Sequence, residues 1–168
     1  SGQHSMDFSI SDLAEEVSDL AHESAGGGKP IEELSSDELY NLGLDLEELD
    51  QNQAKNVYQR AATLDPTNVD AIINLGRILQ LEGDLKMAKQ AYERGLSLNP
   101  RHELANYNLG TIFDELDETS IASSYYEKAP NVPDAHYNLA RLKELAGDQV
   151  SAKRHLQLYK ELVELQGF

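Results

Sequence analysis

Apolar and polar positions alternate with a helical period through most of the chain. Between residues 69 and 98, Ile72 and Leu75 share one helical face, and Ala88 and Tyr92 begin a second. A short polar segment separates the two apolar stretches. The pattern therefore predicts two helices joined by a tight turn, which would pack against each other through their apolar faces.

The same pattern recurs along the sequence. Its first half carries an Asn-Leu-Gly or Asn-Leu-Ala triplet in four places: Asn41-Leu42-Gly43, Asn74-Leu75-Gly76, Asn108-Leu109-Gly110 and Asn138-Leu139-Ala140. Its second half carries an Ala and, four residues later, a large side chain: Ala54/Tyr58, Ala88/Tyr92, Ala122/Tyr126 and Ala152/Leu156. These pairs are spaced 34, 34 and 30 residues apart. A period in this range indicates stacked helical hairpins, because one hairpin cannot bury its apolar face alone.

The repeat resembles the tetratricopeptide repeat (TPR), a pair of antiparallel helices. The second copy matches the family pattern at most positions: Ile72, Leu75, Gly76, Leu79, Gly83-Asp84, Ala88, Tyr92 and Pro100. Only Gly95 departs there, since the family prefers Ala. The resemblance runs from about residue 35 to the C-terminus. It implies an all-α protein, a right-handed α-solenoid of four TPR-like helical hairpins with an extra N-terminal helix.

Glycine and proline mark the limits of the expected helices. Gly83-Asp84 and Gly147-Asp148 should break the chain between paired helices, because Gly tolerates a positive φ. Pro66 and Pro100 should end second helices, because proline cannot continue a helix from its interior.

These signals divide the chain into segments. Residues 1–6 resemble an expression scar, 7–24 predict an acidic amphipathic helix, and 25–34 predict a Gly-rich linker. The TPR array is expected at 35–168, with repeats at about 35–67, 68–102, 103–132 and 133–168 and a C-terminal capping helix. Ser36 is a plausible cap for the first repeat. The leading helix packs on the array, lies free in solution or docks on another copy; the sequence leaves these three arrangements open.

The third and fourth repeats depart from the pattern. Pro130 follows Ala129 directly, so the second helix of the third repeat should lack about one turn. Asn106 stands where the family places a large apolar residue. In the fourth repeat Tyr159 replaces a small residue, which suits a terminal helix.

The charge of the chain is unevenly distributed. The formal net charge is −16, of which −13 falls in residues 1–50 and −3 in residues 51–168. Such acidity repels phosphate backbones, so we expect no direct nucleic-acid binding. Solubility explains the acidic segment as readily as a specific partner does.

Catalytic and metal sites find no support in the sequence. The chain has no cysteine, no nucleophile motif and no paired-histidine spacing, and His136 falls at a packing position. We therefore expect no enzyme activity, no cofactor and no metal. No apolar run is long enough to cross a bilayer, so we expect no membrane association and a cytoplasmic location, while a signal peptide ahead of the given residues stays open.

The asparagine of each triplet is the main candidate for ligand binding. In TPR arrays these residues lie on the first helices, which line the concave groove. The resemblance extends to the TPRs of O-linked N-acetylglucosamine transferases, in which such asparagines grip an extended peptide backbone; the residues here are Asn41, Asn74, Asn108 and Asn138. An amide both donates and accepts hydrogen bonds, as a peptide backbone requires. Alternatively, these asparagines follow the family consensus without a binding role.

Tyrosines and arginines flank this row. Tyr40, Tyr107 and Tyr137 precede an asparagine by one position, and Arg77 and Arg141 follow one by three. Tyrosine offers a large rigid contact surface, and arginine can pair with a carboxylate or carbonyl. The structural alternatives are that each tyrosine packs on a neighbouring helix and that the arginines pair with Asp70 or Glu144.

Together these features predict a non-catalytic protein-protein interaction scaffold. The chain lacks the lysines of chaperone-binding TPRs, and its acidic residues would repel an acidic peptide end. A neutral to basic peptide, extended or helical, is the expected ligand. Two alternatives stay open: self-association through the N-terminal helix into a homo-oligomer, and a regulatory or sensor domain, since the closing residues resemble those of TPR domains in MerR-like bacterial transcriptional regulators.

Overall fold

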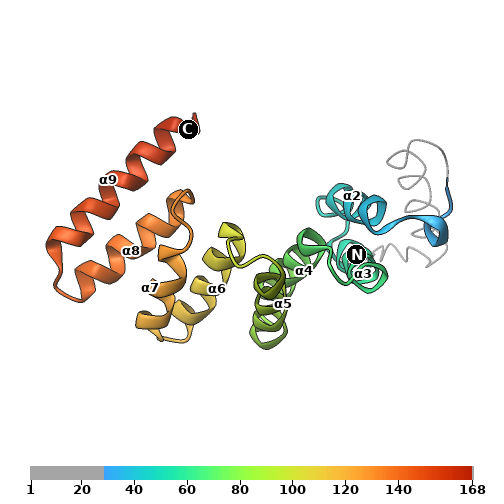
Figure 1. Cartoon of the computed structure of the whole chain (residues 1–168), viewed down its shortest axis with the longest axis horizontal. Helices are drawn as coiled ribbons and strands as arrows, with labels where there is room; N and C mark the ends of the chain where they lie inside the picture. Colours follow the sequence, from blue (N-terminus) through green and yellow to red (C-terminus); the bar gives the residue numbers. More distant parts are fainter. Residues whose placement is uncertain (1–28, 168) are drawn as a thin grey trace, which may run out of the picture. The chain divides into compact units, whose positions relative to one another are not determined.

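The described part of the chain is built from α-helices. The computed structural model describes residues 29–167, and within that range it contains a short 3-10 helix, η1 (Ile31–Glu33), eight α-helices and no strand (Figure 1). The α-helices are α2 (Ser36–Leu46), α3 (Gln51–Leu64), α4 (Val69–Leu81), α5 (Leu85–Leu98), α6 (Glu103–Glu115), α7 (Thr119–Glu127), α8 (Pro133–Leu145) and α9 (Gln149–Leu165). The predicted all-α fold is confirmed. The amphipathic helix predicted at 7–24 lies outside the described residues.

The chain divides into two compact units, with the division inside α4 between Ala71 and Ile72. The first unit contains η1, α2, α3 and the first turn of α4. The second contains the rest of α4 and all later helices.

In the first unit, α2 and α3 pack as a hairpin. Their backbones approach closely because Gly43 faces Tyr58, whose ring atom Cε1 lies 2.3 Å from where a Cβ on Gly43 would be. Leu39, Leu42 and Leu46 are fully buried in this interface. The hairpin thus has the small-against-aromatic packing that the repeat pattern predicts.

The start of α2 differs from expectation by one residue. Ser35 is the N-cap, and it forms a capping box with Glu38. Backbone and side-chain hydrogen bonds to Ser35 and Lys29 lower the pKa of the Glu38 carboxyl. Ser36, the predicted cap, is buried instead, and its hydroxyl donates to the carbonyl of Ala61 at 2.8 Å. Ser36 thus fastens α2 to α3, a role that local sequence does not reveal.

In the second unit, helices pack both within hairpins and between them. The packed pairs are α6 with α7, α8 with α9, α5 with α6, and α7 with α8. Gly76 faces Tyr92 and Gly110 faces Tyr126 at distances that a Cβ would not allow without displacement. Tyr92 and Tyr126 are almost completely buried. The repeated glycine therefore makes room for the repeated tyrosine ring.

The turns between paired helices follow the prediction, with one substitution. Gly83 and Gly147 have φ values of 83° and 81°, as expected. In the third repeat this place is taken by Asp117, with φ 61°. It is the one non-glycine residue at positive φ among residues 29–167. Asp is tolerated there better than most residues, but at a cost in strain.

The third repeat has the short helix that its sequence predicts. Helix α7 has 9 residues, whereas α3 and α5 each have 14. Asn106 is buried nearby, and its amide donates to the carbonyls of Pro100 and His102 at 3.2 and 3.1 Å. This asparagine therefore fastens the start of α6 to the loop before it.

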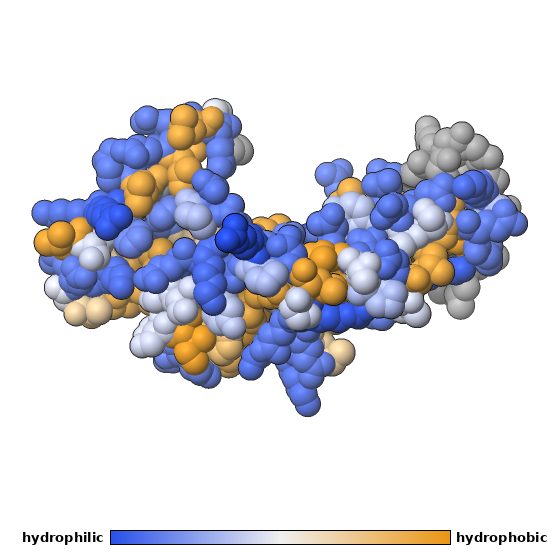
Figure 2. Space-filling view, in the orientation of Figure 1, coloured by the Kyte–Doolittle hydropathy of each residue, from blue (hydrophilic) through white to orange (hydrophobic). Residues whose placement is uncertain are grey.

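Several large apolar side chains are exposed on the last two helices. Figure 2 shows apolar surface along α9, the last helix in Figure 1. The exposed apolar side chains of α8 and α9 include Leu145, Val150, Leu156 and Leu165. In the earlier hairpins the residues that correspond to Leu156 are buried: Tyr58, Tyr92 and Tyr126.

Candidate protein-interaction site

The four asparagines occupy matching positions on the first helices but differ in exposure. Asn41 is exposed on α2 in the first unit. In the second unit, Asn74 on α4 and Asn138 on α8 are half-buried, and Asn108 on α6 is 8% exposed. Nδ2 of Asn108 is buried and makes no hydrogen bond of normal geometry within residues 29–167, but it lies near the hydroxyl of Tyr92, whose pKa the Asn108 amide lowers.

The three tyrosines make contacts within their own hairpins. Ring centroids lie 5.9 Å apart for Tyr40 and Tyr58, and 5.8 Å apart for Tyr107 and Tyr126. Tyr40 and Tyr107 are half-buried, so part of each ring supports the fold.

Tyr137 is the most exposed of the three. It lies 5.4 Å from the ring of Tyr159, which fills the position of a small residue in earlier repeats, and Tyr137 is 52% exposed. In the second repeat that small residue is Gly95, which packs against buried Ile73. The larger Tyr159 side chain leaves no such room, so Tyr137 turns its surface toward solvent.

Arg141 has a different partner from those considered in the sequence. Its Nη2 donates to Oδ2 of Asp114, on the preceding first helix, rather than to Asp70 or Glu144. The pair joins α8 to α6. Arg141 is thus already engaged by a carboxylate, while Arg77 lies close enough to Tyr92 to affect its titration.

A hydrogen-bonded relay that sequence inspection missed links one hairpin to the next. The hydroxyl of Tyr92 donates to Oε1 of Gln80 at 2.9 Å, and Nε2 of Gln80 donates to Thr111 at 2.8 Å. In the next repeat, the hydroxyl of Tyr126 donates to Asp114 at 3.0 Å, and Asp114 accepts from Arg141.

In the first unit the hydroxyl of Tyr58 donates to Glu47 at 2.5 Å. The signal in the sequence is a polar residue six positions after each asparagine: Glu47, Gln80, Asp114 and Glu144. In the first three repeats a tyrosine follows it 11 or 12 positions later. The fourth repeat keeps Glu144 but has Leu156 in place of the tyrosine.

Burial affects the titration of these tyrosines. Burial raises the pKa of Tyr92, against the influence of Arg77 and of the Asn108 amide. Burial and the hydrogen bond to Asp114 raise the pKa of Tyr126. Burial and the charge of Asp134 raise the pKa of Tyr107, while the Asn138 amide acts in the opposite direction. Tyr107 and Asn138, from neighbouring repeats, therefore lie close together.

Two histidines meet between α8 and α9. Nδ1 of His136 lies 3.0 Å from Nδ1 of His155, and Nε2 of His136 lies 2.9 Å from the carbonyl oxygen of Pro130. The two rings stack at a centroid distance of 5.3 Å. Burial, followed by the charges of His136, Arg154 and Lys143, lowers the pKa of His155, and Glu127 opposes this shift. His136 has the packing role expected from its position.

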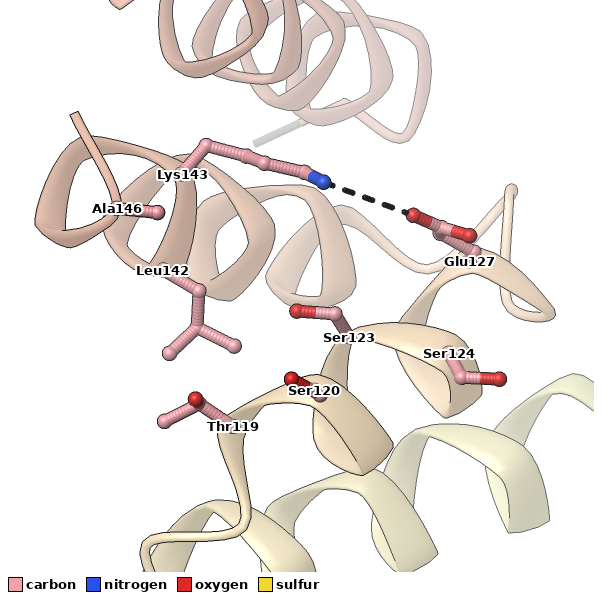
Figure 3. Close-up of a pocket in the computed structure, with 8 residues that line it drawn as sticks. All are labelled: Thr119, Ser120, Ser123, Ser124, Glu127, Leu142, Lys143 and Ala146. Atoms are coloured by element: carbon pink, nitrogen blue, oxygen red, sulfur yellow. Dashed lines mark ion pairs between the residues drawn. The ribbon is translucent and has the colours of Figure 1, made fainter. Parts of the chain in front are cut away.

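A polar pocket of about 360 Å³ lies between α7 and α8 (Figure 3). Hydroxyls of Thr119, Ser120 and Ser123 face it, and Lys143 pairs with Glu127 at 4.0 Å at one side. At the preceding junction the equivalent positions hold Lys89 and Phe113, with Nζ of Lys89 5.1 Å from the ring centroid. The pocket is therefore space left where a serine and a lysine replace a cation–aromatic pair.

Residues 29–167 contain no cluster of three or more histidine, aspartate or glutamate side chains arranged to hold a metal ion. In the same range, no helix has the length and apolar character needed to span a bilayer.

Comparison with known families supports the repeat interpretation. Residues 46–106 match the family model described as tetratricopeptide repeat. No curated protein sequence matches the chain.

Solved structures of MamA are similar to the chain over nearly its whole length. One, titled a crystal structure of MamA, is 21% identical, with 96% of this chain and 98% of that chain covered and a TM-score of 0.70. A second, MamA from residue 41 to its end from Desulfovibrio magneticus RS-1, is also 21% identical, with 95% and 100% covered and a TM-score of 0.67. At this identity the likeness concerns the fold.

Neither match is a MerR-like regulator. The tetratricopeptide fold is typically a non-catalytic interaction scaffold, and its repeats bind protein partners. Residues 46–106 thus match the tetratricopeptide repeat, and the described residues have an all-α fold similar to that of MamA.

Proposed function

We propose that the chain binds a peptide segment, without catalysis, along the face formed by the first helices of its repeats. The observation that carries this proposal is the row of Asn74, Asn108 and Asn138 in the second unit. These residues stand at matching positions on α4, α6 and α8, and the side chains of Asn74 and Asn138 are partly exposed.

The chemistry of the row suits a peptide backbone. Each asparagine amide offers donors to a carbonyl and an acceptor to an N–H, so successive asparagines can hold successive peptide groups. Because backbone groups are the same in every residue, this grip has little sequence preference. Tyr107 and Tyr137 lie beside the row and supply apolar contact area with few rotatable bonds.

The charge arrangement favours a neutral or basic ligand. Asp114 already pairs with Arg141, so this arginine is not free to attract a ligand carboxylate. Asp134 lies close enough to Tyr107 to raise the pKa of its hydroxyl. An acidic peptide would meet these carboxylates without a compensating free arginine.

Self-association through the N-terminal helix and a role in a DNA-binding regulator are the two other functions considered. No contact among residues 29–167 favours either over peptide binding.

Selection from a random peptide library displayed on phage tests the proposal. Peptides that bind the full chain are then measured by calorimetry against Asn74→Ala, Asn138→Ala and the double variant. Each change should raise Kd by about fivefold to a hundredfold, since an amide hydrogen bond contributes about 1–3 kcal/mol when its partner is buried. Asn56→Ala, at an exposed site on α3, is the matched control and should leave Kd unchanged. Equal affinities for all variants would overturn the proposal.

A further inference from the structure

Within the described residues, the hairpin of α8 and α9 has an open face that, in the two preceding hairpins, is covered by the first helix of the next hairpin. A pocket of about 400 Å³ lies between α8 and α9, and its lining includes Glu144, Ala152, Lys153 and Leu156. Leu156 is 38% exposed, whereas its counterparts Tyr92 and Tyr126 are 0% and 1% exposed. Within the second unit, α6 packs on α5 and α8 packs on α7 at the corresponding places. The face between α8 and α9 thus corresponds to two faces that a helix covers in this structure: α6 covers the one beside α5, and α8 covers the one beside α7.

We propose that this end face binds an amphipathic helix of another protein, which stacks on α8 and α9 as the first helix of a further hairpin would. The surface is separate from the asparagine row, although Tyr137 and Arg141 border both. The proposal goes beyond peptide binding at the asparagines and does not depend on it.

The two filled interfaces define the chemistry of the incoming helix. At each of them, the polar residue six positions after the asparagine bonds to the residue three positions after the next asparagine. These pairs are Gln80 with Thr111, and Asp114 with Arg141. Glu144 holds the same position in the last hairpin, and neither an ion pair nor a hydrogen bond engages its side chain within residues 29–167. An arginine or lysine of the incoming helix is the complementary partner.

A second position specifies an aromatic side chain. Lys89, which directly follows the repeat alanine on α5, lies over the ring of Phe113 on the next helix. Lys153 has the same place after Ala152 on α9 and is exposed. An aromatic residue two positions after the basic residue of the incoming helix would lie over Lys153, as Phe113 follows Thr111 by two.

A second copy of this chain fits the face less well. In α2, the first helix of the array, Leu44 occupies the position of Arg141. It cannot pair with Glu144. The charge of Glu144 therefore favours a partner helix with a basic residue at that point.

A synthetic peptide supplies the probe. It has the sequence of residues 133–145 with Lys143→Phe, which combines the arginine and the aromatic residue on one helix. A lactam bridge between solvent-facing positions keeps it helical, because helices of this length are marginal alone. Titration into the isotope-labelled full chain should give saturable NMR shifts centred on Ala140, Ala152 and Leu156. The proposal is overturned if the peptide causes no saturable shifts, or if the shifts centre on Asn74 and Asn108.

Charge reversal makes the test specific. Glu144→Lys should weaken binding of the peptide at least fivefold. A peptide that also carries Arg141→Glu should bind the Glu144→Lys variant more tightly than it binds the unchanged protein. Lys153→Glu should weaken binding, whereas Asn74→Ala should not. Circular dichroism checks that each variant is folded. Unchanged affinities across the Glu144 and Lys153 variants would contradict the assignment.

Sedimentation equilibrium tests whether a second copy of this chain, rather than a helix of another protein, occupies the face. We expect the full chain to form no oligomer through this face, so Leu156→Asp should leave its molecular mass in solution unchanged. If it forms a dimer that this substitution converts to a monomer, the face binds a second copy, and the proposed partner helix is wrong.

Discussion

The hydroxyl of Tyr126 donates a 3.0 Å hydrogen bond to Oδ2 of Asp114, and that same oxygen accepts from Arg141 of the next hairpin. Tyr126 is almost completely buried, so the bond forms at the edge of the core. One carboxylate thus joins the packing within a hairpin to the stacking between hairpins. This relation explains why a tyrosine, rather than a phenylalanine, serves at the aromatic position.

Removing this hydroxyl should lower stability. Tyr126→Phe keeps the ring but leaves Asp114 with one donor fewer, so we expect a loss of about 1–2 kcal/mol in the free energy of unfolding. Urea denaturation followed by circular dichroism measures it. Tyr125→Phe is the control, because Tyr125 stacks on Phe113 through its ring alone within the described residues, and it should change stability little. Equal effects of the two substitutions would show that the relay contributes nothing.

The glycine of the triplet should be coupled to the tyrosine. A Cβ on Gly110 would lie 2.7 Å from ring atoms of Tyr126, so Gly110→Ala should destabilise by about 1–2 kcal/mol despite the better helix propensity of alanine. In the fourth repeat Ala140 replaces this glycine and Leu156 replaces this tyrosine, so an alanine is paired with a smaller side chain. In a Tyr126→Leu background, Gly110→Ala should therefore be neutral or stabilising. A double-mutant cycle in urea should show at least about 1 kcal/mol of coupling, and additive effects would contradict the account.

Replacing Asp117 by glycine should stabilise the fold. Asp117 has φ 61°, a conformation that costs less for glycine, and glycine already holds this place in two other turns. We expect Asp117→Gly to add about 0.5–1 kcal/mol to the free energy of unfolding, because relief of strain exceeds the entropy cost of glycine. The reverse change, Gly83→Asp, should destabilise by a similar amount. Thermal unfolding checks both, and a lower Tm for Asp117→Gly would show that its side chain has a stabilising role.

The histidine pair should make stability depend on pH. The folded-state pKa of His155 lies below its ordinary value of 6.5, so below that pH the unfolded chain binds more protons than the folded chain. Stability is therefore full above about pH 6.5 and falls as the pH drops toward the lowered value. His155→Gln should flatten the change in unfolding free energy between about pH 7.5 and pH 5.5. An unchanged slope would mean that other groups cause the pH dependence.

Much of the fold follows from the sequence because the repeat encodes it redundantly. The helical period, the turn glycines and the spacing of the triplets each predict the same hairpins. The short α7 was also predictable, since Pro130 stands one turn too early. The position of Ser36 was not, because its hydrogen bond to Ala61 joins residues 25 positions apart and no local signal distinguishes it from Ser35.

The candidate site was less predictable for a physical reason. Sequence spacing places Asn74, Asn108 and Asn138 on one face but does not give their burial, which depends on neighbouring hairpins. The partner of Arg141 depends in the same way on where α6 lies relative to α8. The relay from Tyr126 through Asp114 becomes visible only when both contacts are present. Assigning these asparagines to ligand binding stays a prediction.

The side-chain amides of the asparagine row provide the most direct test of peptide binding at the first helices. The amide protons of Asn74, Asn108 and Asn138 each give their own signals in a 15N-correlated NMR spectrum of the full chain. When a library-selected peptide is added, we predict that all three pairs shift, with the larger changes at the partly exposed Asn74 and Asn138. If the peptide binds with saturation while all three pairs stay where they were, the asparagine row is not the binding site and the proposed function is contradicted.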